Sequence, residues 1–161
     1  MEFRVLGPVE VRVAGQCVDA GHARQRSVLA VLVLDLGQAV SAELLIDRVW
    51  GEDPPASVRN VLYGYVGRLR AVIASAADPG VSLSRYQGGY QLRAGPEQVD
   101  MHRFRRMAAE ASTAGDDERA GVLLREALGL WHGPALAGLD SGWLQGMRTS
   151  LELERVAAIS I

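Results

Sequence analysis

The sequence contains no lysine, a single cysteine and no long apolar run. Cys17 alone allows neither an intramolecular disulfide nor a zinc site with several thiolate ligands, and we expect it to be a small buried or half-buried residue. The longest apolar stretch, Val28 to Leu34, is too short to cross a bilayer. The first residues also lack the basic start and apolar core of a signal peptide. These absences predict a cytoplasmic protein with no membrane partner.

Motifs for catalysis and for cofactor binding are missing as well. His22, His102 and His132 are scattered, and none has a carboxylate or cysteine at metal-ligand spacing. Glycine is frequent, but neither of the glycine-rich phosphate-binding motifs, GxGxxG and GxxxxGKS/T, occurs. The sequence therefore predicts a protein that is not an enzyme and that holds no metal and no cofactor.

The residues that are present describe a folded chain with unevenly distributed charge. Apolar residues make up 48% of the 161 positions and charged residues 22%, which is typical of one large or two small globular domains. The formal net charge is -2. Residues 56–93 nevertheless hold five arginines against Asp78 alone, a local charge of +4, whereas residues 100–161 carry -2. Because nucleic-acid binding needs a local cationic face, residues 56–93 are a candidate binding segment.

All 17 cationic residues are arginine. The planar guanidinium group suits bidentate contacts to phosphate or guanine. A GC-rich genome would produce the same composition with no functional meaning. Both explanations are open on the sequence alone.

Apolar periodicity in the first 96 residues predicts a small domain of strands and helices. In chain order we expect strands at 3–6, 9–13 and 16–18, helices at 23–36, 42–50 and 57–74, and strands at 81–84 and 89–92. The second and third helices are joined by the short acidic loop Glu52–Pro55. The last two strands form a hairpin with Arg85 at its tip. This order is typical of a winged helix-turn-helix.

Strand signals disappear beyond the linker at residues 93–99. Asp100 is expected to cap a helix over residues 101–112, Asp116 and Asp117 to start a second that reaches about Trp131, and a third to begin near Gly142. Antiparallel helices of this kind form the unit of a helical-repeat array. The predicted fold is an α+β winged helix-turn-helix domain (residues 1–96) followed by an all-α helical domain (residues 97–161).

The helix at residues 57–74 separates into two faces. One carries the apolar residues Val58, Leu62, Tyr65, Val66, Leu69 and Ile73. The opposite face is small and uncharged at its centre, and arginines border it, which suits close approach to a major groove. The predicted DNA contacts are Ser57, Arg59, Asn60, Tyr63, Gly64, Arg68, Arg70 and Arg85. A merely solvated helix surface is the alternative explanation.

Six segments together carry a resemblance to a known family. They are FRVLGPVEV (3–11), RQRSVLA (24–30), LIDRVWGEDPP (45–55), YVGRLR (65–70), VDMHRF (99–104) and LLREALGLWHGPAL (123–136). The chain resembles the Streptomyces antibiotic regulatory protein family, in which an OmpR-like winged helix precedes a TPR-like bacterial transcriptional activator domain. That domain normally continues through more helices, so we expect this chain to be part of a longer regulator.

The resemblance implies an activator of a secondary-metabolite gene cluster, for example one for an antibiotic. Such activators bind direct repeats near a promoter, where a homodimer on the DNA is one possible arrangement, and they recruit RNA polymerase through its sigma factor. The expected place of action is the nucleoid. Glu52 and Asp53 match the loop where OmpR-like proteins contact polymerase. A turn that only improves solubility would have the same acidic composition. The wing, SRYQGGY at residues 84–90, departs from the proline-containing wing of the relatives.

A protein-interaction module, with the winged helix as its docking surface, is the competing class of function. The two classes differ in their dependence on salt. Binding to several DNA phosphates weakens steeply with salt, with a slope of about 0.9 per phosphate contact on logarithmic axes. Docking onto a protein generally lacks that slope.

Overall fold

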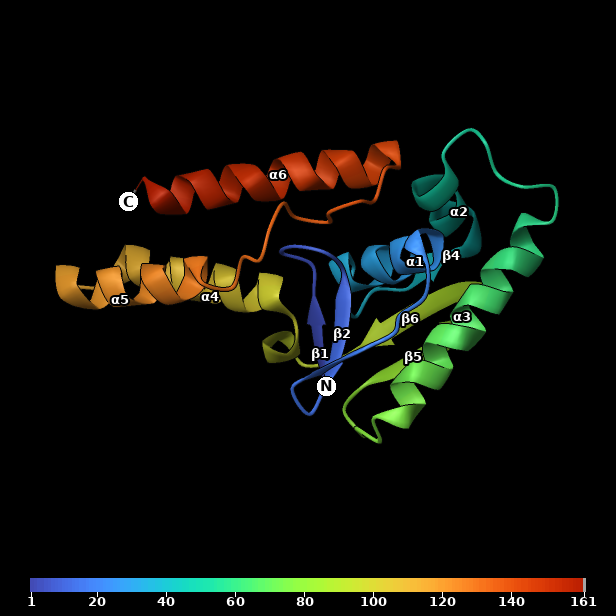
Figure 1. The fold of residues 1–161 in the computed structure, drawn as a ribbon, viewed down its shortest axis with the longest axis horizontal. Coiled ribbons are helices and arrows are strands. Elements are labelled where there is room, and N and C mark those ends of the chain that lie inside the picture. Colours follow the sequence, from blue (N-terminus) through green and yellow to red (C-terminus); the bar gives the residue numbers. More distant parts are fainter. Residues whose placement is uncertain (161) are drawn as a thin grey trace.

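The computed structural model describes residues 1–160 (Figure 1). The helix-turn-helix lies at one end of an elongated molecule and two helices of the second half lie at the other, with a small amino-terminal sheet between them. The last helix of the chain runs back across the molecule and contacts the second helix of the helix-turn-helix. Within residues 1–160 no helix is long and apolar enough to cross a membrane.

The amino-terminal sheet is the predicted antiparallel meander. It contains β1 (Glu2–Arg4), β2 (Glu10–Val13) and β3 (Gln16–Val18) in that order. Phe3 pairs with Val11, and both side chains are buried. Cys17 pairs with Arg12 on the outward face and is exposed, so the expectation of a buried or half-buried cysteine was wrong. Since β3 is the edge strand, no further strand covers it.

Two helices pack beneath the third helix of this half. Helix α1 (Ala23–Leu34) is almost fully enclosed after its first turn. Helix α2 (Ala42–Trp50) begins where the Ser41 hydroxyl accepts a hydrogen bond from the Leu44 amide at 3.1 Å. Gly51, with φ at 63°, ends it. This positive φ is easiest for glycine because it has no Cβ.

Helix α3 (Val58–Ser75) follows a loop at residues 51–57 and packs against both α1 and α2. Its predicted apolar stripe forms the buried face, with Leu62, Val66, Leu69 and Ile73 all at most 7% exposed. The three helices thus have the arrangement of a helix-turn-helix, with α3 along the outer edge of the molecule (Figure 1).

A second sheet completes the winged helix, with strand order β4-β6-β5. The strands are β4 (Val40–Ser41), β5 (Ser82–Tyr86) and β6 (Gly89–Arg93). Gln87 and Gly88 have φ angles of 48° and 77°, so two residues close the hairpin. The prediction of Arg85 at the tip was therefore wrong. Arg85 lies within β5, opposite Tyr90.

The second half consists of a short 3₁₀ helix η1 (Pro96–Gln98), α4 (Asp100–Thr113), α5 (Asp117–Leu128) and α6 (Gly142–Ile159). Asp116 caps α5, as predicted, and its carboxylate accepts from the Glu118 amide at 2.9 Å. Helix α5 ends before Trp131, which packs edge-to-face on Phe104 of α4 instead. The helical class predicted for this half is confirmed.

Asp100 is the first residue of α4 and Val99 is its N-cap, so the expectation that Asp100 caps this helix was wrong. Its side chain instead joins the two halves. Its carboxylate accepts from the amides of Val5 at 2.9 Å and Leu6 at 3.0 Å, and also from Met101 at 2.8 Å. The loop before α6 adds three backbone hydrogen bonds, donated by the amides of His132, Leu136 and Ala137 to the carbonyls of Leu6, Val5 and Gly7. We call this junction the seam. The apolar core runs through both halves, and the division at residues 96 and 97 stays a prediction.

Candidate DNA-binding surface

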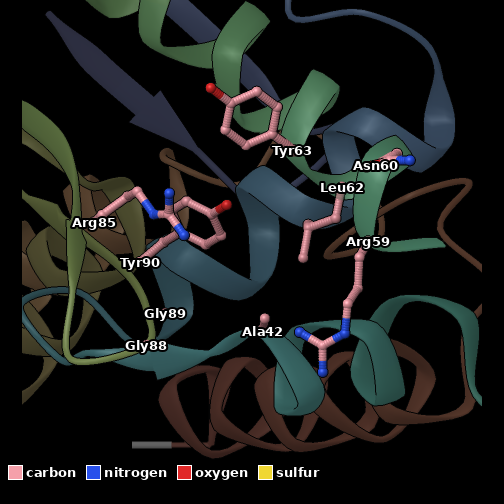
Figure 2. Close-up of a pocket in the computed structure, with 9 residues that line it drawn as sticks. All are labelled: Ala42, Arg59, Asn60, Leu62, Tyr63, Arg85, Gly88, Gly89 and Tyr90. Carbon is pink, nitrogen blue, oxygen red and sulfur yellow. The ribbon is translucent and has the colours of Figure 1, made fainter. Parts of the chain in front are cut away.

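A shallow cavity of about 240 Å³ lies where α2, α3 and the hairpin meet (Figure 2). It brings together four of the predicted contacts, Arg59, Asn60, Tyr63 and Arg85, from segments far apart in the sequence. The other residues that line it are Ala42, Leu62, Gly88, Gly89 and Tyr90. The helix and the wing therefore present one continuous surface.

The centre of the outward face of α3 is open. Asn60 and Gly67 are exposed, Gly64 is half-exposed, and Tyr63 is 62% exposed. A Cβ atom added at Gly64 or Gly67 would meet no heavy atom within 4 Å. Packing within the described chain therefore does not require either glycine. Each costs about 1 kcal/mol of helix stability relative to alanine.

The three predicted arginines of α3 have different partners. Arg59 forms an exposed ion pair with Glu43 of α2 at 2.8 Å. The Arg68 guanidinium lies 5.9 Å from the centre of the Tyr65 ring. Arg70 is half-buried, and its Nε donates to the Leu83 carbonyl at 2.9 Å. Arg70 therefore ties α3 to β5, a role that the helical wheel did not indicate.

Glu43 is a neighbour that the sequence interpretation missed. The hydrogen bond from Arg59 lowers the pKa of the Glu43 carboxyl, and the positive charge of Arg59 acts in the same direction. Glu43 is therefore ionised at neutral pH and places a negative charge beside the cavity. No local pattern linked residues 43 and 59, because their contact depends on the angle between α2 and α3.

The wing depends on a close approach between two backbones. A Cβ atom at Gly89 would lie 2.0 Å from the Val40 carbonyl oxygen, so only glycine fits where β6 pairs with β4. This contact holds the hairpin beside the first turn of α2. The sequence predicted Gly89 as the first residue of a strand, but nothing local indicated its close approach to Val40.

A cluster of rings joins α3 to the start of α1 and the end of α2. Tyr65 stacks on Trp50 with ring centres 6.1 Å apart, and His22 meets it edge-on at 5.1 Å. Arg24 donates to the Val49 carbonyl at 2.9 Å and so fixes the start of α1 to the end of α2. Trp50 is half-buried in this group.

The remaining predicted residues lie around the start of α3. Ser57 precedes the helix without a capping hydrogen bond and lines a second depression together with Arg59 and Asn60. Glu52 and Asp53 are exposed in the loop before it. Among residues 1–160 there is no group of three histidine, cysteine or acidic side chains that could hold a metal ion.

Two family models match the chain, one in each half. Residues 20–92 match the model described as "Transcriptional regulatory protein, C terminal", and residues 99–160 match "Bacterial transcriptional activator domain". The fold and the surface thus define a winged-helix regulator joined to an activator domain. The chain has the two-domain organisation of the Streptomyces antibiotic regulatory protein family, which it resembles.

The curated relatives of this chain are regulatory proteins. The chain is 39% identical to the regulatory protein AfsR of Streptomyces coelicolor over 94% of its own length and 15% of AfsR. It is 35% identical to the transcriptional regulator RedD of the same species, over 99% of this chain and 47% of RedD. The chain therefore spans less than half the length of these relatives.

A solved structure has the same fold. The chain superimposes on Mycobacterium tuberculosis EmbR, solved in complex with a low-affinity phosphopeptide, with a TM-score of 0.89 and 34% identity. The match covers 98% of this chain and 43% of the EmbR chain. It includes both halves, so the predicted fold class is confirmed.

Proposed function

We propose that this chain is a sequence-specific DNA-binding transcription activator that reads promoter DNA through the exposed face of α3. The observation that carries the proposal is the surface of that helix, whose small uncharged centre is open to solvent and is bordered by Arg59 and Arg68. An α-helix fits the major groove, and small residues let its backbone approach the base edges.

Five of the predicted contact residues have specific roles in this proposal. The Asn60 amide is placed to pair with an adenine edge. Arg68 and Ser57 flank it and reach phosphates, and Tyr63 and Arg85 line the cavity between the helix and the wing. In this arrangement α3 supplies the sequence reading and the hairpin contacts the backbone beside it.

The finer parts of the proposal rest on the family. We assign to the chain the binding of direct repeats, as two copies side by side, and the recruitment of RNA polymerase through its sigma factor. Its targets would be genes for secondary metabolites, and it would act at the nucleoid. The names of AfsR and RedD as regulators, together with the activator-domain match, support these assignments.

Alanine at position 60 is expected to remove sequence reading. Asn60→Ala should weaken binding to the cognate duplex by about 1–3 kcal/mol and relax the preference at one base pair, because a bidentate adenine contact is lost. Arg68→Ala should instead weaken cognate and random duplexes by similar factors and make the salt slope shallower by about one unit. Fluorescence anisotropy on duplexes selected from a random pool measures both effects.

The same titrations distinguish DNA binding from protein docking. A chain that selects no sequence and shows no steep salt dependence would refute the proposed function. If Arg68→Ala changed base preference while Asn60→Ala did not, the function would stand, but α3 would be rotated in the groove relative to this assignment.

The acidic loop is expected to act in transcription and not in DNA binding. Because Glu52 and Asp53 are exposed and phosphate repels them, replacing both with alanine should leave promoter affinity intact or slightly higher. Activated transcription should fall if the loop contacts polymerase. In vitro transcription with the double variant measures this, and unchanged activation would exclude the loop from the mechanism.

A further inference from the structure

The Glu43–Arg59 ion pair connects the two helices of the helix-turn-helix beside the cavity. Arg59 Nη2 donates to Glu43 Oε1 at 2.8 Å, from the second residue of α3 to the first turn of α2. Figure 2 shows the Arg59 side chain running from α3 toward α2. The two side chains are 63% and 76% exposed. Such exposed pairs contribute little to stability, so stability alone does not account for this one.

A carboxylate at this place reduces the general attraction for DNA. The start of a helix is normally favourable for phosphate, because its free amides and its dipole attract anions. Glu43 occupies the first turn of α2, and its charge offsets that of Arg59. The ion pair therefore lowers the net positive charge that Arg59 contributes at the edge of the cavity.

Resting on the proposed DNA-binding function, we infer that Glu43 is a positioning residue that sets specificity through Arg59. Glu43 holds the Arg59 guanidinium beside the cavity, where its remaining N–H donors can contact a base edge. The same ion pair prevents Arg59 from binding a phosphate when the DNA has a random sequence. Arg68 has no carboxylate partner among residues 1–160, and Arg70 donates to a backbone carbonyl. Among residues 1–160, Arg59 is thus the arginine of α3 that a carboxylate holds in place.

The test compares Glu43→Gln with the unchanged 161-residue chain on a random duplex and on the duplex selected from a random pool. With Arg59 released to one additional phosphate, affinity for the random duplex should rise about fivefold near 0.15 M salt and the salt slope should steepen by about 0.9. Affinity for the selected duplex should not rise, because Arg59 already contacts it. The ratio of the two affinities should therefore fall about fivefold.

Asp47→Asn is the matched control. Asp47 is exposed one turn further along α2, so the same charge is removed where, among the described residues, no arginine pairs with the carboxylate. Its effect on either duplex should stay below about twofold, since salt screens charges beyond roughly 8 Å. In an Arg59→Ala background, Glu43→Gln should have no larger effect than Asp47→Asn.

Three outcomes would overturn the inference. They are equal effects of Glu43→Gln and Asp47→Asn, an effect of Glu43→Gln that persists in the Arg59→Ala background, and an unchanged ratio of the two affinities. Thermal unfolding monitors the fold of each variant. If the unchanged chain selects a duplex and Glu43→Gln does not lower the ratio of the two affinities, the inference about Glu43 fails and the proposed function stands. If the unchanged chain selects no duplex, the proposed function fails.

Discussion

Replacing Asp100 with alanine is expected to lower the free energy of unfolding by about 2–6 kcal/mol, because each buried amide left without an acceptor costs roughly 1–3 kcal/mol. Asp100 is 1% exposed and accepts from Val5 and Leu6, both of which are also buried. Water cannot replace the carboxylate without opening the seam. Urea unfolding followed by circular dichroism measures the change.

The pH dependence of stability provides a second test of Asp100. Burial raises the pKa of its carboxyl, and the three amide donors oppose this without cancelling it. At pH values between the ordinary aspartate pKa and the raised pKa of Asp100, the folded chain holds a proton that the unfolded chain has released. Stability should therefore fall as the pH rises through that interval. Asp100→Asn, which does not titrate, should lose this component.

Asp116→Ala is the control for the seam. Asp116 also accepts from a backbone amide, but it is exposed and caps its own helix, so its loss should cost only about 0.5–2 kcal/mol. Residues 1–96, which lack Asp100, test the proposed domain division. They should unfold cooperatively but at lower urea concentration than the full chain. If Asp100→Ala proved no more destabilising than Asp116→Ala, Asp100 would not hold the seam.

Alanine at both Gly64 and Gly67 is expected to change stability and DNA binding in opposite directions. The free energy of unfolding of the double variant should be about 2 kcal/mol higher, because each Gly-to-Ala substitution in a helix adds about 1 kcal/mol of stability. Neither added Cβ meets a neighbouring atom. Affinity for the selected duplex should fall by about tenfold or more, since the added methyl groups hold α3 away from the base edges. Thermal unfolding and fluorescence anisotropy measure the two effects.

Gly146→Ala is the matched control for the helical glycines. Gly146 lies inside α6, is exposed, and has no heavy atom within 4 Å of an added Cβ. It should increase stability by about 1 kcal/mol and leave DNA binding unchanged. Were the Gly64 and Gly67 double variant to bind the duplex as tightly as the unchanged chain, close approach through the centre of α3 would be excluded.

The sequence by itself determined the order of the helices and strands and the outward face of α3, because both depend on residues a few positions apart along the chain. The spacing of Leu62, Val66 and Leu69 fixes which side of the helix is buried. Ser41 and Asp116 act on amides two or three residues away, so their capping roles were readable without any tertiary contact. The order of the elements then limited the fold to a winged helix-turn-helix followed by helices.

Only the tertiary structure decided which of the exposed arginines are free and how the two halves meet. Glu43 and Arg59 are 16 positions apart, Arg70 and Leu83 are 13 apart, and Asp100 reaches Val5 across 95. Such contacts are set by the packing angles between helices and by the path of the chain through the seam, and no local periodicity encodes either. The position of Arg85 depended likewise on a two-residue turn whose backbone angles placed it within β5 and beside the cavity.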